Sequence, residues 1–329
     1  MHESEPPHIT VIGGGTGSST LLSELKHYTP NLSAVVNMSD DGGSSGRLRD
    51  ELGVMPPGDV RQCLTALSNE PVLADIYASR FDEGVFEGHA FGNLVLAYKE
   101  LESDFATAVR YASKLLDITG QVIPVTLRTH DLVMQDGGEV IRGEHTIGHR
   151  PIQHRSPKVW LEPAVGLTNE AEEAIHRADQ IVIAPGNAYG SILPALLVDG
   201  MRQVLADARG QKVVVSNLIN KPGQTDNWHA LDYVEMYEDY TGRVDAVLYN
   251  NQTIDPSTLA ACSEGQQQVG FEPSRFDQRP EVQVVGDSFV NETIHAQGLG
   301  DKNTQRTTLR HNAVKISQHL IQMAGKENS

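Results

Sequence analysis

The stretch HITVIGGGTGSS, residues 8–19, contains the signals that decide the fold. Residues 8–12 form a short β-branched run that is typical of a buried strand, and a glycine turn separates it from a helical stretch at about 18–27. A turn between a strand and a helix presents free backbone N–H groups, which can bind a phosphate. The stretch therefore predicts the start of an alternating α/β fold, with an anion-binding turn at residues 13–19.

The same alternation of strands and helices continues along the chain. Further strands are predicted at residues 33–38, 122–127, 159–161, 180–184, 212–216 and 245–249, and further helices at residues 59–67, 92–101, 104–116, 169–178, 192–207 and 228–240. Continuous apolar strands bounded by helices are typical of a parallel sheet that is covered on both faces. We therefore predict an α/β fold of the Rossmann-like, doubly wound kind, with a mostly parallel sheet and helices on both faces.

The chain shows no internal repeat, low-complexity tract or obvious linker, so we predict one α/β domain over residues 1–329. A long Gly/Ser-rich loop follows the second strand. Residues 128–158 interrupt the alternation with a small irregular excursion that contains a hairpin. The C-terminal segment, residues 256–329, is expected to be irregular until a final amphipathic helix at 312–323, which packs on the sheet.

Composition narrows the class of protein. The chain has 26 basic and 43 acidic side chains, a net charge of −17, which argues against general nucleic-acid binding because that needs a basic surface. Two distant cysteines offer no disulfide framework, and neither a signal peptide nor an apolar run long enough to span a membrane is visible. We expect a cytoplasmic protein. The sequence leaves open whether it forms a homodimer.

The glycine turn GGGTGSS is the first predicted ligand site. Its spacing is neither the dinucleotide G-x-G-x-x-G pattern nor a Walker A loop, which would need a lysine. The alternative is simple tight packing between the strand and the helix. The residues predicted to hold a phosphate here are Gly13, Gly14, Gly15, Thr16 and Gly17.

The loop after the second strand, SDDGGSSGRLRDELG at 39–53, is the second predicted site. Loops at the carboxyl ends of neighbouring parallel strands converge on one crevice, so this loop is expected beside the glycine turn. Asp40 and Asp41 are candidates for binding Mg²⁺ or a hydroxyl, and Arg47 and Arg49 for clamping a phosphate. The alternative is a solvated turn whose arginines pair with neighbouring carboxylates.

Two segments further along the chain add candidates for binding and catalysis. Asp59 and Arg61 follow a rigid Pro-Pro-Gly turn; Asp59 is predicted as the helix N-cap or as a ligand, and Arg61 as part of an anion site or of a surface ion pair. In GHAFGN at 88–93, His89 is a candidate acid or base and Asn93 a candidate ligand, with structural roles as the alternatives. With Asp41 and Asp59, His89 completes the set of candidate catalytic residues.

Two later turns follow predicted strands and open helices or loops. APGNAYGS at 184–191 is a second predicted anion or ribose site, and SNLINKPGQTDNW follows at 216–228. The candidates in these turns are Gly186, Asn187, Ser191 and Asn217.

Two further patterns are not expected to carry chemistry. Residues 42–46 fit the G-x-S-x-G pattern of a nucleophile elbow, but Ser44 lies in a predicted loop rather than on a strand-to-helix turn. His145 and His149 are four residues apart, but the irregular excursion around them argues against one helical face.

Taken together, these segments resemble the CofD-like superfamily, and specifically its gluconeogenesis-factor (YvcK-like) branch. The resemblance rests on GGGTGSSTLL, SDDGGSSGRLRDELGVMPPGDVRQCLTAL, GHAFGNL, IVIAPGNAYGSILPALLV and NLINKPGQTD, which occur in this order. It implies a Rossmann-like fold and a pocket for a phosphorylated nucleotide, because members of this branch are associated with UDP-N-acetylglucosamine. It also implies a link to gluconeogenic growth, cell shape and peptidoglycan synthesis. A basic pair shared with the branch makes Arg310 a candidate diphosphate contact.

The resemblance leaves more than one function open. The leading hypothesis is a nucleotide-sugar-binding regulator whose partners are cell-wall or metabolic enzymes. The other branch of the superfamily is 2-phospho-L-lactate transferase, which transfers phospholactate from a diphosphate-activated donor to a deazaflavin. Under that hypothesis Asp40 and Asp41 would hold Mg²⁺. A nicotinamide-dependent oxidoreductase is the third hypothesis, with Asp40 as the ribose acid, and the wrong glycine spacing opposes it. Whether any ligand is turned over is not decided by the sequence.

Overall fold

The main sheet consists of seven parallel strands. In the computed structural model, which describes residues 5–154, 157–262, 265–291 and 309–325, the strands lie in the order β10-β9-β8-β7-β1-β2-β3. Every neighbouring pair in the sheet runs parallel. Their bounds are β1 (Ile9–Gly13), β2 (Leu32–Val36), β3 (Gln121–Pro124), β7 (Gln180–Ile183), β8 (Gln211–Val215), β9 (Ala246–Asn250) and β10 (Gln283–Asp287).

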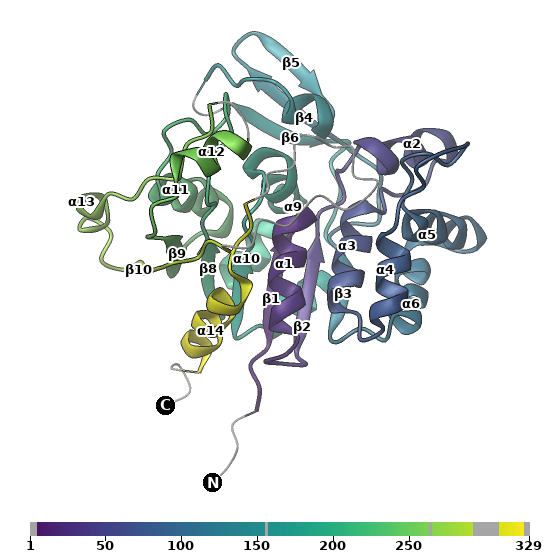
Figure 1. Cartoon of the computed structure of the whole chain (residues 1–329), viewed down its shortest axis with the longest axis horizontal. Coiled ribbons are helices and arrows are strands. Elements are labelled where there is room, and N and C mark those ends of the chain that lie inside the picture. Colours follow the sequence, from purple (N-terminus) through teal and green to yellow (C-terminus); the bar gives the residue numbers. More distant parts are fainter. Residues whose placement is uncertain (1–4, 155–156, 263–264, 292–308, 326–329) are drawn as a thin grey trace.

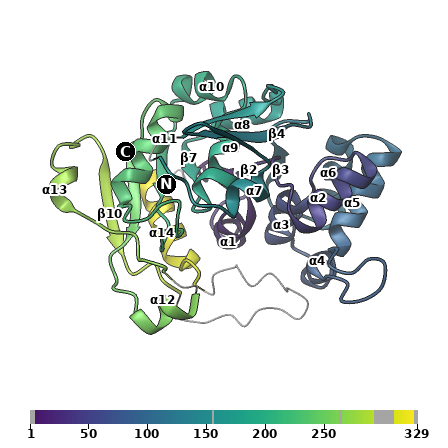
Figure 2. The same ribbon diagram turned by 90° about the horizontal axis from the view of Figure 1, so that it is seen from above.

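Helices cover both faces of this sheet, as Figure 2 shows. One face carries α1 (Gly15–Leu25), α3 (Gly58–Leu67) and α14 (Ala313–Ala324), which pack side by side. The other face carries α8 (Asn169–Arg177), α10 (Met201–Asp207) and α11 (Ala230–Thr241). The predicted fold class, a doubly wound α/β fold with a mostly parallel sheet, is confirmed.

The remaining helical elements flank this frame or lie at its ends (Figure 1). They are α2 (Gly43–Leu52), α4 (Pro71–Ala78), α5 (Phe91–Glu102), α6 (Phe105–Leu115), the π-helical turn η1 (Ala188–Ile192), α9 (Leu193–Leu196), α12 (Pro256–Cys262) and α13 (Pro273–Phe276). None of the helices in the described part of the chain is both long enough and apolar enough to cross a membrane.

A small antiparallel sheet replaces the predicted irregular excursion. It has the order β5-β4-β6, from β4 (Asp131–Asp136), β5 (Glu139–Arg142) and β6 (Lys158–Glu162), with the short helix α7 (Glu144–Gly148) between β5 and β6. Figure 1 shows this sheet above the carboxyl ends of β1 and β2. The β4–β5 hairpin confirms the prediction. The prediction that residues 159–161 join the parallel sheet is wrong, because β6 buries alternate residues, as a strand with one covered face does.

Two other sequence predictions are also corrected. The Gly/Ser-rich segment expected as a loop forms α2, which buries Leu48 against the neighbouring α5. Its glycines and serines have low helix propensity, and tertiary contacts override that preference. The segment after Pro256 contains β10, a half-buried edge strand of the main sheet, as well as α12 and α13. The final helix was predicted correctly, as α14.

The strand order places a switch point beside β1. Ile9 pairs with Leu32 of β2 on one side and with Gln180 of β7 on the other. The chain builds the sheet from β1 through β2 to β3, and then from β7 outward to β10. In open parallel sheets, ligands bind outside the carboxyl ends of the strands at such a point. All five residues of β1 and of β2 are buried, so these strands form a rigid support for the loops that follow them.

Candidate functional site

A cleft with two adjacent compartments lies at the carboxyl ends of the central strands. We call one the α2 compartment, because α2 and the loop before it form its wall, and the other the β8 compartment, because the loop after β8 lines it. Their volumes are about 690 Å³ and about 680 Å³, respectively. Six residues line both: Thr16, Gly148, His149, Asn187, Ser191 and Lys221.

The β8 compartment brings together one part of the predicted ligand residues. They come from the start of α1, from the loop after β7, from the loop after β8 and from the segment before α14. Those on its wall are Gly14, Thr16, Gly17, Gly186, Asn187, Ser191, Asn217 and Arg310. Gly13 is the last residue of β1 and does not line either compartment.

Asn217 fixes the loop after β7 rather than offering a free amide. Its Oδ1 accepts a hydrogen bond of 2.9 Å from the N–H of Gly186, and its Nδ2 donates one of 2.8 Å to the carbonyl of the same residue. The neighbouring loops of β7 and β8 are therefore locked together at the switch point. Asn217 shapes the compartment, while the backbone around Gly186 faces it.

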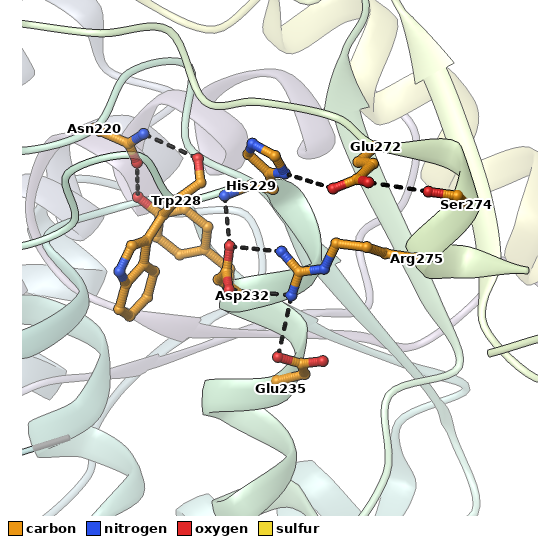
Figure 3. Close-up of polar contacts among 9 residues, drawn as sticks. Asn220, Trp228, His229, Asp232, Glu235, Glu272, Ser274 and Arg275 are labelled. Carbon is orange, nitrogen blue, oxygen red and sulfur yellow. Dashed lines mark hydrogen bonds and ion pairs between the residues drawn. The ribbon is translucent and has the colours of Figure 1, made fainter. Parts of the chain in front are cut away.

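A polar network on α11 fixes the rest of the loop after β8 (Figure 3). Asn220 donates 2.9 Å to the carbonyl of Trp228 and accepts 3.1 Å from the hydroxyl of Tyr233. Further along, Asp232 accepts two hydrogen bonds, of 3.0 and 3.1 Å, from the guanidinium of Arg275. Since Asn220 lines the β8 compartment, these contacts give that wall a fixed shape.

The α2 compartment holds the other part of the predicted residues. Those on its wall, besides the shared Thr16, Asn187 and Ser191, are Gly15, Asp40, Arg47, Asp59, Arg61 and Asn93. Five charged residues that the sequence analysis did not single out also line it: Arg80, Asp82, Glu87, Glu144 and Lys221. Their place in the cleft depends on the positions of distant segments.

A buried hydrogen-bond chain runs along the wall of the α2 compartment. The Nε of Arg61 donates 2.9 Å to Oδ1 of Asn93, and Nδ2 of Asn93 donates 3.0 Å to Oγ of Ser44. Oγ of Ser44 also forms a hydrogen bond of 3.0 Å with Nδ1 of His89, and the tautomer of the His89 ring sets which of the two groups donates. His89 lies just behind the wall. Burial, together with the positive charges of Arg47 and Arg80, lowers the pKa of His89, and Glu51 partly opposes this.

Two carboxylates of the α2 compartment lie against neighbouring glycines, one at the glycine turn and one at η1. Asp59 lies against Gly14, where an added Cβ would collide with its carboxylate. Glu144 lies in the same way over Gly190 of η1. Asp59 is not the N-cap of α3, as one interpretation predicted: the helix begins at Gly58, so Asp59 is already inside its first turn. Its carboxylate is instead directed toward the turn.

The two adjacent aspartates of the DDGG motif point to different places. Oδ1 of Asp40 accepts 3.1 Å from the N–H of Gly42, and Asp40 lines the α2 compartment. Asp41 does not line either compartment; its Oδ1 accepts 2.6 Å from the N–H of His145 in the first turn of α7. The two side chains predicted to share Mg²⁺ therefore diverge. Within the described ranges, no group of three or more His, Cys, Asp or Glu side chains is arranged to hold a metal ion.

Glu144 has a strongly raised pKa. Burial, together with the negative charges of Asp40, Asp41 and Asp59, raises this pKa to about 8, although Lys221 opposes the shift. Burial likewise lowers the pKa of Lys221, and Glu144 opposes that change. At neutral pH, Glu144 therefore holds a proton and can donate a hydrogen bond, which an ionised glutamate cannot do.

The structure also gives the positions of the two sequence patterns that were not expected to carry chemistry. Ser44 lies in the first turn of α2, not in a loop, and its hydroxyl contacts His89 as described above. His145 lies on α7, and His149 follows as its C-cap residue. Their rings are 4.1 Å apart, so the expectation that they do not share one face is wrong.

The fold and the cleft define a Rossmann-like protein whose site for anionic ligands lies at the switch point of its sheet. Comparison with known proteins gives the family. The family model described as 2-phospho-L-lactate transferase CofD matches residues 9–290, so the chain belongs to the CofD family.

Relatives and a solved structure extend this assignment over nearly the whole chain. The chain is 36% identical over 323 residues to a protein of Halalkalibacterium halodurans named gluconeogenesis factor, covering 96% of each. A Clostridium acetobutylicum protein is 41% identical over 256 residues, which are 75% of this chain and 57% of that protein. A crystal structure of a UPF0052 family member from Bacillus halodurans is similar, with a TM-score of 0.85 and 35% identity over 96% of this chain and 99% of that one.

Proposed function

We propose that the protein binds a nucleotide sugar of the UDP-N-acetylglucosamine type and regulates cell shape and peptidoglycan synthesis during gluconeogenic growth. The observation that supports this proposal is the convergence of the α1 turn, the β7 loop and Arg310 on the β8 compartment. Its partners would be cell-wall or metabolic enzymes. A relative named gluconeogenesis factor, similar along its full length, supports the metabolic part of the proposal.

In this proposal, backbone groups hold the diphosphate. The N-cap of α1 is Gly14, which has no side chain to bond the N–H groups of the first turn, so these can donate to phosphate oxygens. Asn187 and Ser191 lie at the boundary of the two compartments and would contact the ribose or the sugar. Arg310 would neutralise the negative charge from the opposite side.

A transferase resembling 2-phospho-L-lactate transferase is the second candidate function. The description of the matching family model and the carboxylates of the α2 compartment favour it. Mg²⁺ commonly binds one or two carboxylates together with substrate phosphates, so Asp40 and Asp59 fit this ion better than the predicted pair of Asp40 and Asp41. Mg²⁺ would neutralise a diphosphate there, while this chain's own residues would orient the donor and the deazaflavin acceptor.

Calorimetry separates the two functions. The protein is titrated with UDP-N-acetylglucosamine, with GDP and with the deazaflavin Fo, each with and without Mg²⁺, and the ligands are examined by mass spectrometry after overnight incubation. We expect binding of the intact UDP-sugar and no product. Binding of GDP or Fo with no response to the UDP-sugar would favour the transferase.

The substitution Arg310→Gln tests the position of the nucleotide. Loss of one charge-assisted phosphate contact should weaken UDP-N-acetylglucosamine about 10-fold or more. Arg110→Gln is the matched control, because Arg110 is exposed on α6 and bonds only locally, to Thr107. If both variants bind the UDP-sugar as the wild type does, the assignment of the diphosphate to the β8 compartment is wrong.

A further inference from the structure

We propose that α4, the loop that follows it at residues 79–90 and the first residue of α5 form a docking surface for a basic amphipathic helix of a partner protein. We call this surface the α4 edge. It exposes six large apolar side chains beside a surplus of carboxylates: Val72, Ile76, Phe81, Val85, Phe86 and Phe91. The inference goes beyond the proposed function, because it does not depend on what the cleft binds.

Exposed apolar side chains concentrate at the α4 edge. Of the 15 large apolar side chains that are exposed in the described part of the chain, six lie within residues 72–91. Val85 is 89% exposed and Val72 is 74% exposed, the two highest values among the 15. Single exposed apolar side chains are ordinary on a protein surface, whereas a group of them with a polar rim is typical of a binding surface.

The outer side of α4 is an apolar ridge. Of the eight residues of this helix, only Tyr77 is buried. Val72 and Ile76 are four positions apart, so they lie one turn apart on the same face of the helix. Side chains with this spacing form the ridges that pack into the grooves of a second helix. The exposed face of α4 therefore suits a helix as its partner.

The loop after α4 holds its apolar side chains in a fixed arrangement. The N–H of Phe81 donates 3.0 Å to the carbonyl of His89, and the N–H of Gly88 donates 2.8 Å to the carbonyl of Phe81. The rings of Phe81 and Phe86 lie 5.5 Å apart. A loop that is ordered before it binds loses less conformational entropy in a complex.

The base of this loop is fixed to the C-terminal end of α4, at the periphery of the molecule (Figure 2). The carbonyl of Ser79, the residue after α4, accepts a hydrogen bond of 2.9 Å from the N–H of Phe91. The ring of Phe91 lies 6.1 Å from the ring of Tyr77 on α4. The loop therefore leaves α4 and returns to it, which holds its apolar side chains near the end of the helix that carries Ile76.

The charge of the α4 edge favours a basic partner. Residues 69–91 contain five acidic residues and one arginine, Arg80. Asp75 on α4 and Asp82 and Glu83 in the loop are exposed, and within the described residues their carboxylates form no ion pair. Lysine and arginine side chains of a partner would pair with these carboxylates around the apolar contact and would steer its approach.

The same charge argues against two other occupants. A second copy of the chain would bring identical carboxylates together, because a two-fold interface pairs a surface with itself. A membrane with anionic lipids would repel them as well. The chain has a net charge of −17, so the rest of the molecule adds to either repulsion.

The test uses the full chain and a fluorescently labelled synthetic helix of leucine and lysine, with all leucines on one face, and measures binding by anisotropy at low and at physiological salt. We expect the lysine peptide to bind, and a peptide with glutamate in place of lysine not to bind. Phe86→Ser should weaken the lysine peptide about 10-fold or more, because it removes an aromatic anchor. Val140→Ser is the matched control, since Val140 is 52% exposed on β5, away from the α4 edge.

A double variant, Asp82→Asn with Glu83→Gln, tests the role of charge. It should weaken the lysine peptide and reduce the effect of salt on its affinity, while thermal unfolding stays as in the wild type. Peptide binding that neither Phe86→Ser nor the double variant changes would mean a general attraction to an acidic protein and would overturn the inference. The absence of any binding to the wild type would overturn it too.

Sedimentation velocity and vesicle binding test the other occupants. A dimer of the protein alone that Phe86→Ser separates would mean that a second copy covers the α4 edge. Binding to phosphatidylcholine vesicles that Val85→Ser abolishes would mean that lipid does. Either result would overturn the inference. None of these measurements uses the UDP-sugar, so they leave the proposed function to its own test.

Discussion

The two compartments of the cleft are built in different ways. The β8 compartment is lined mainly by segments that directly follow strands of the main sheet: the turn that begins α1, the loop after β7 and the loop after β8. The α2 compartment is made largely by side chains that hold one another, such as Arg61, Asn93 and Ser44. The first depends on local chain geometry, and the second on contacts between distant segments.

This difference determines how strongly a single substitution should disturb each compartment. A backbone N–H group at a helix start remains when a side chain is changed, so the β8 compartment should tolerate most single substitutions apart from the loss of a charge. In the α2 compartment, one deletion leaves several buried partners unsatisfied, because the same side chains bond each other in series. Three predictions test the comparison, beginning with the largest expected effect.

Asn93→Leu should disrupt the buried hydrogen-bond chain on the wall of the α2 compartment. Asn93 is 1% exposed and bonds both Arg61 and Ser44, so leucine removes the acceptor of a buried guanidinium and the donor of a buried hydroxyl. We expect the free energy of unfolding to fall by about 3 kcal/mol, measured by urea denaturation. Asn93→Asp is the control, because it keeps an acceptor for Arg61. A loss below about 0.5 kcal/mol in the leucine variant would show that the chain of bonds contributes little.

Glu144→Gln tests the α2 compartment through the pH dependence of the free energy of unfolding. The pKa of Glu144 in the folded protein is about 8, against an ordinary value of 4.5. Between these values the folded state keeps a proton that the unfolded state has lost, so this group makes stability fall as pH rises, until the slope ends above about pH 8. Glutamine cannot ionise. The variant should match the wild type near pH 4.5 and exceed its stability by about 2 kcal/mol at pH 6, and this difference should grow until about pH 8.

A second acid outside the cleft provides the control for this experiment. Burial raises the pKa of Glu100 to about 7, although hydrogen bonds from Met55 oppose the shift. Glu100→Gln should therefore remove only the part of the pH slope that lies below about pH 7. If Glu144→Gln leaves the slope between pH 7 and 8 unchanged, Glu144 is ionised in the folded protein at neutral pH.

The main sheet and the β8 compartment were largely predictable from the sequence. Strand and helix periodicity is local, and so is a glycine turn that follows a strand, which is why β1, α1 and the turn at residues 13–17 were located correctly. Because parallel strands end at one edge of the sheet, the loop after β2 was also expected beside the glycine turn. The family resemblance, rather than any local pattern, pointed to Arg310.

Much of the α2 compartment could not be predicted in this way. Arg61 and Asn93 are 32 residues apart, and Ser44 and His89 are 45 apart, so no spacing rule relates them. Glu144 enters the cleft from α7, the short helix between β5 and β6. The sequence of this region indicates only a hairpin. The divergence of Asp40 and Asp41 depends on α7, whose first turn binds one of the two carboxylates. Such contacts depend on tertiary structure and not on sequence distance.

The smallest expected effect concerns Arg49, the neighbour of Arg47 on α2. Residues two apart on a helix do not share a face, and Arg49 points away from the cleft, with Nη1 3.2 Å from Asp131 and Nε 3.3 Å from Asp50. Both partner carboxylates are exposed, at 47% and 70%, so the ion pairs stabilise the fold only weakly.

Arg49→Gln should therefore lower the free energy of unfolding by at most about 0.5 kcal/mol, and it should leave the binding of UDP-N-acetylglucosamine unchanged. Urea denaturation and calorimetry check both expectations. A clearly larger loss of stability would mean that the ion pair between Arg49 and Asp131 holds α2 against β4 more strongly than exposed ion pairs usually do.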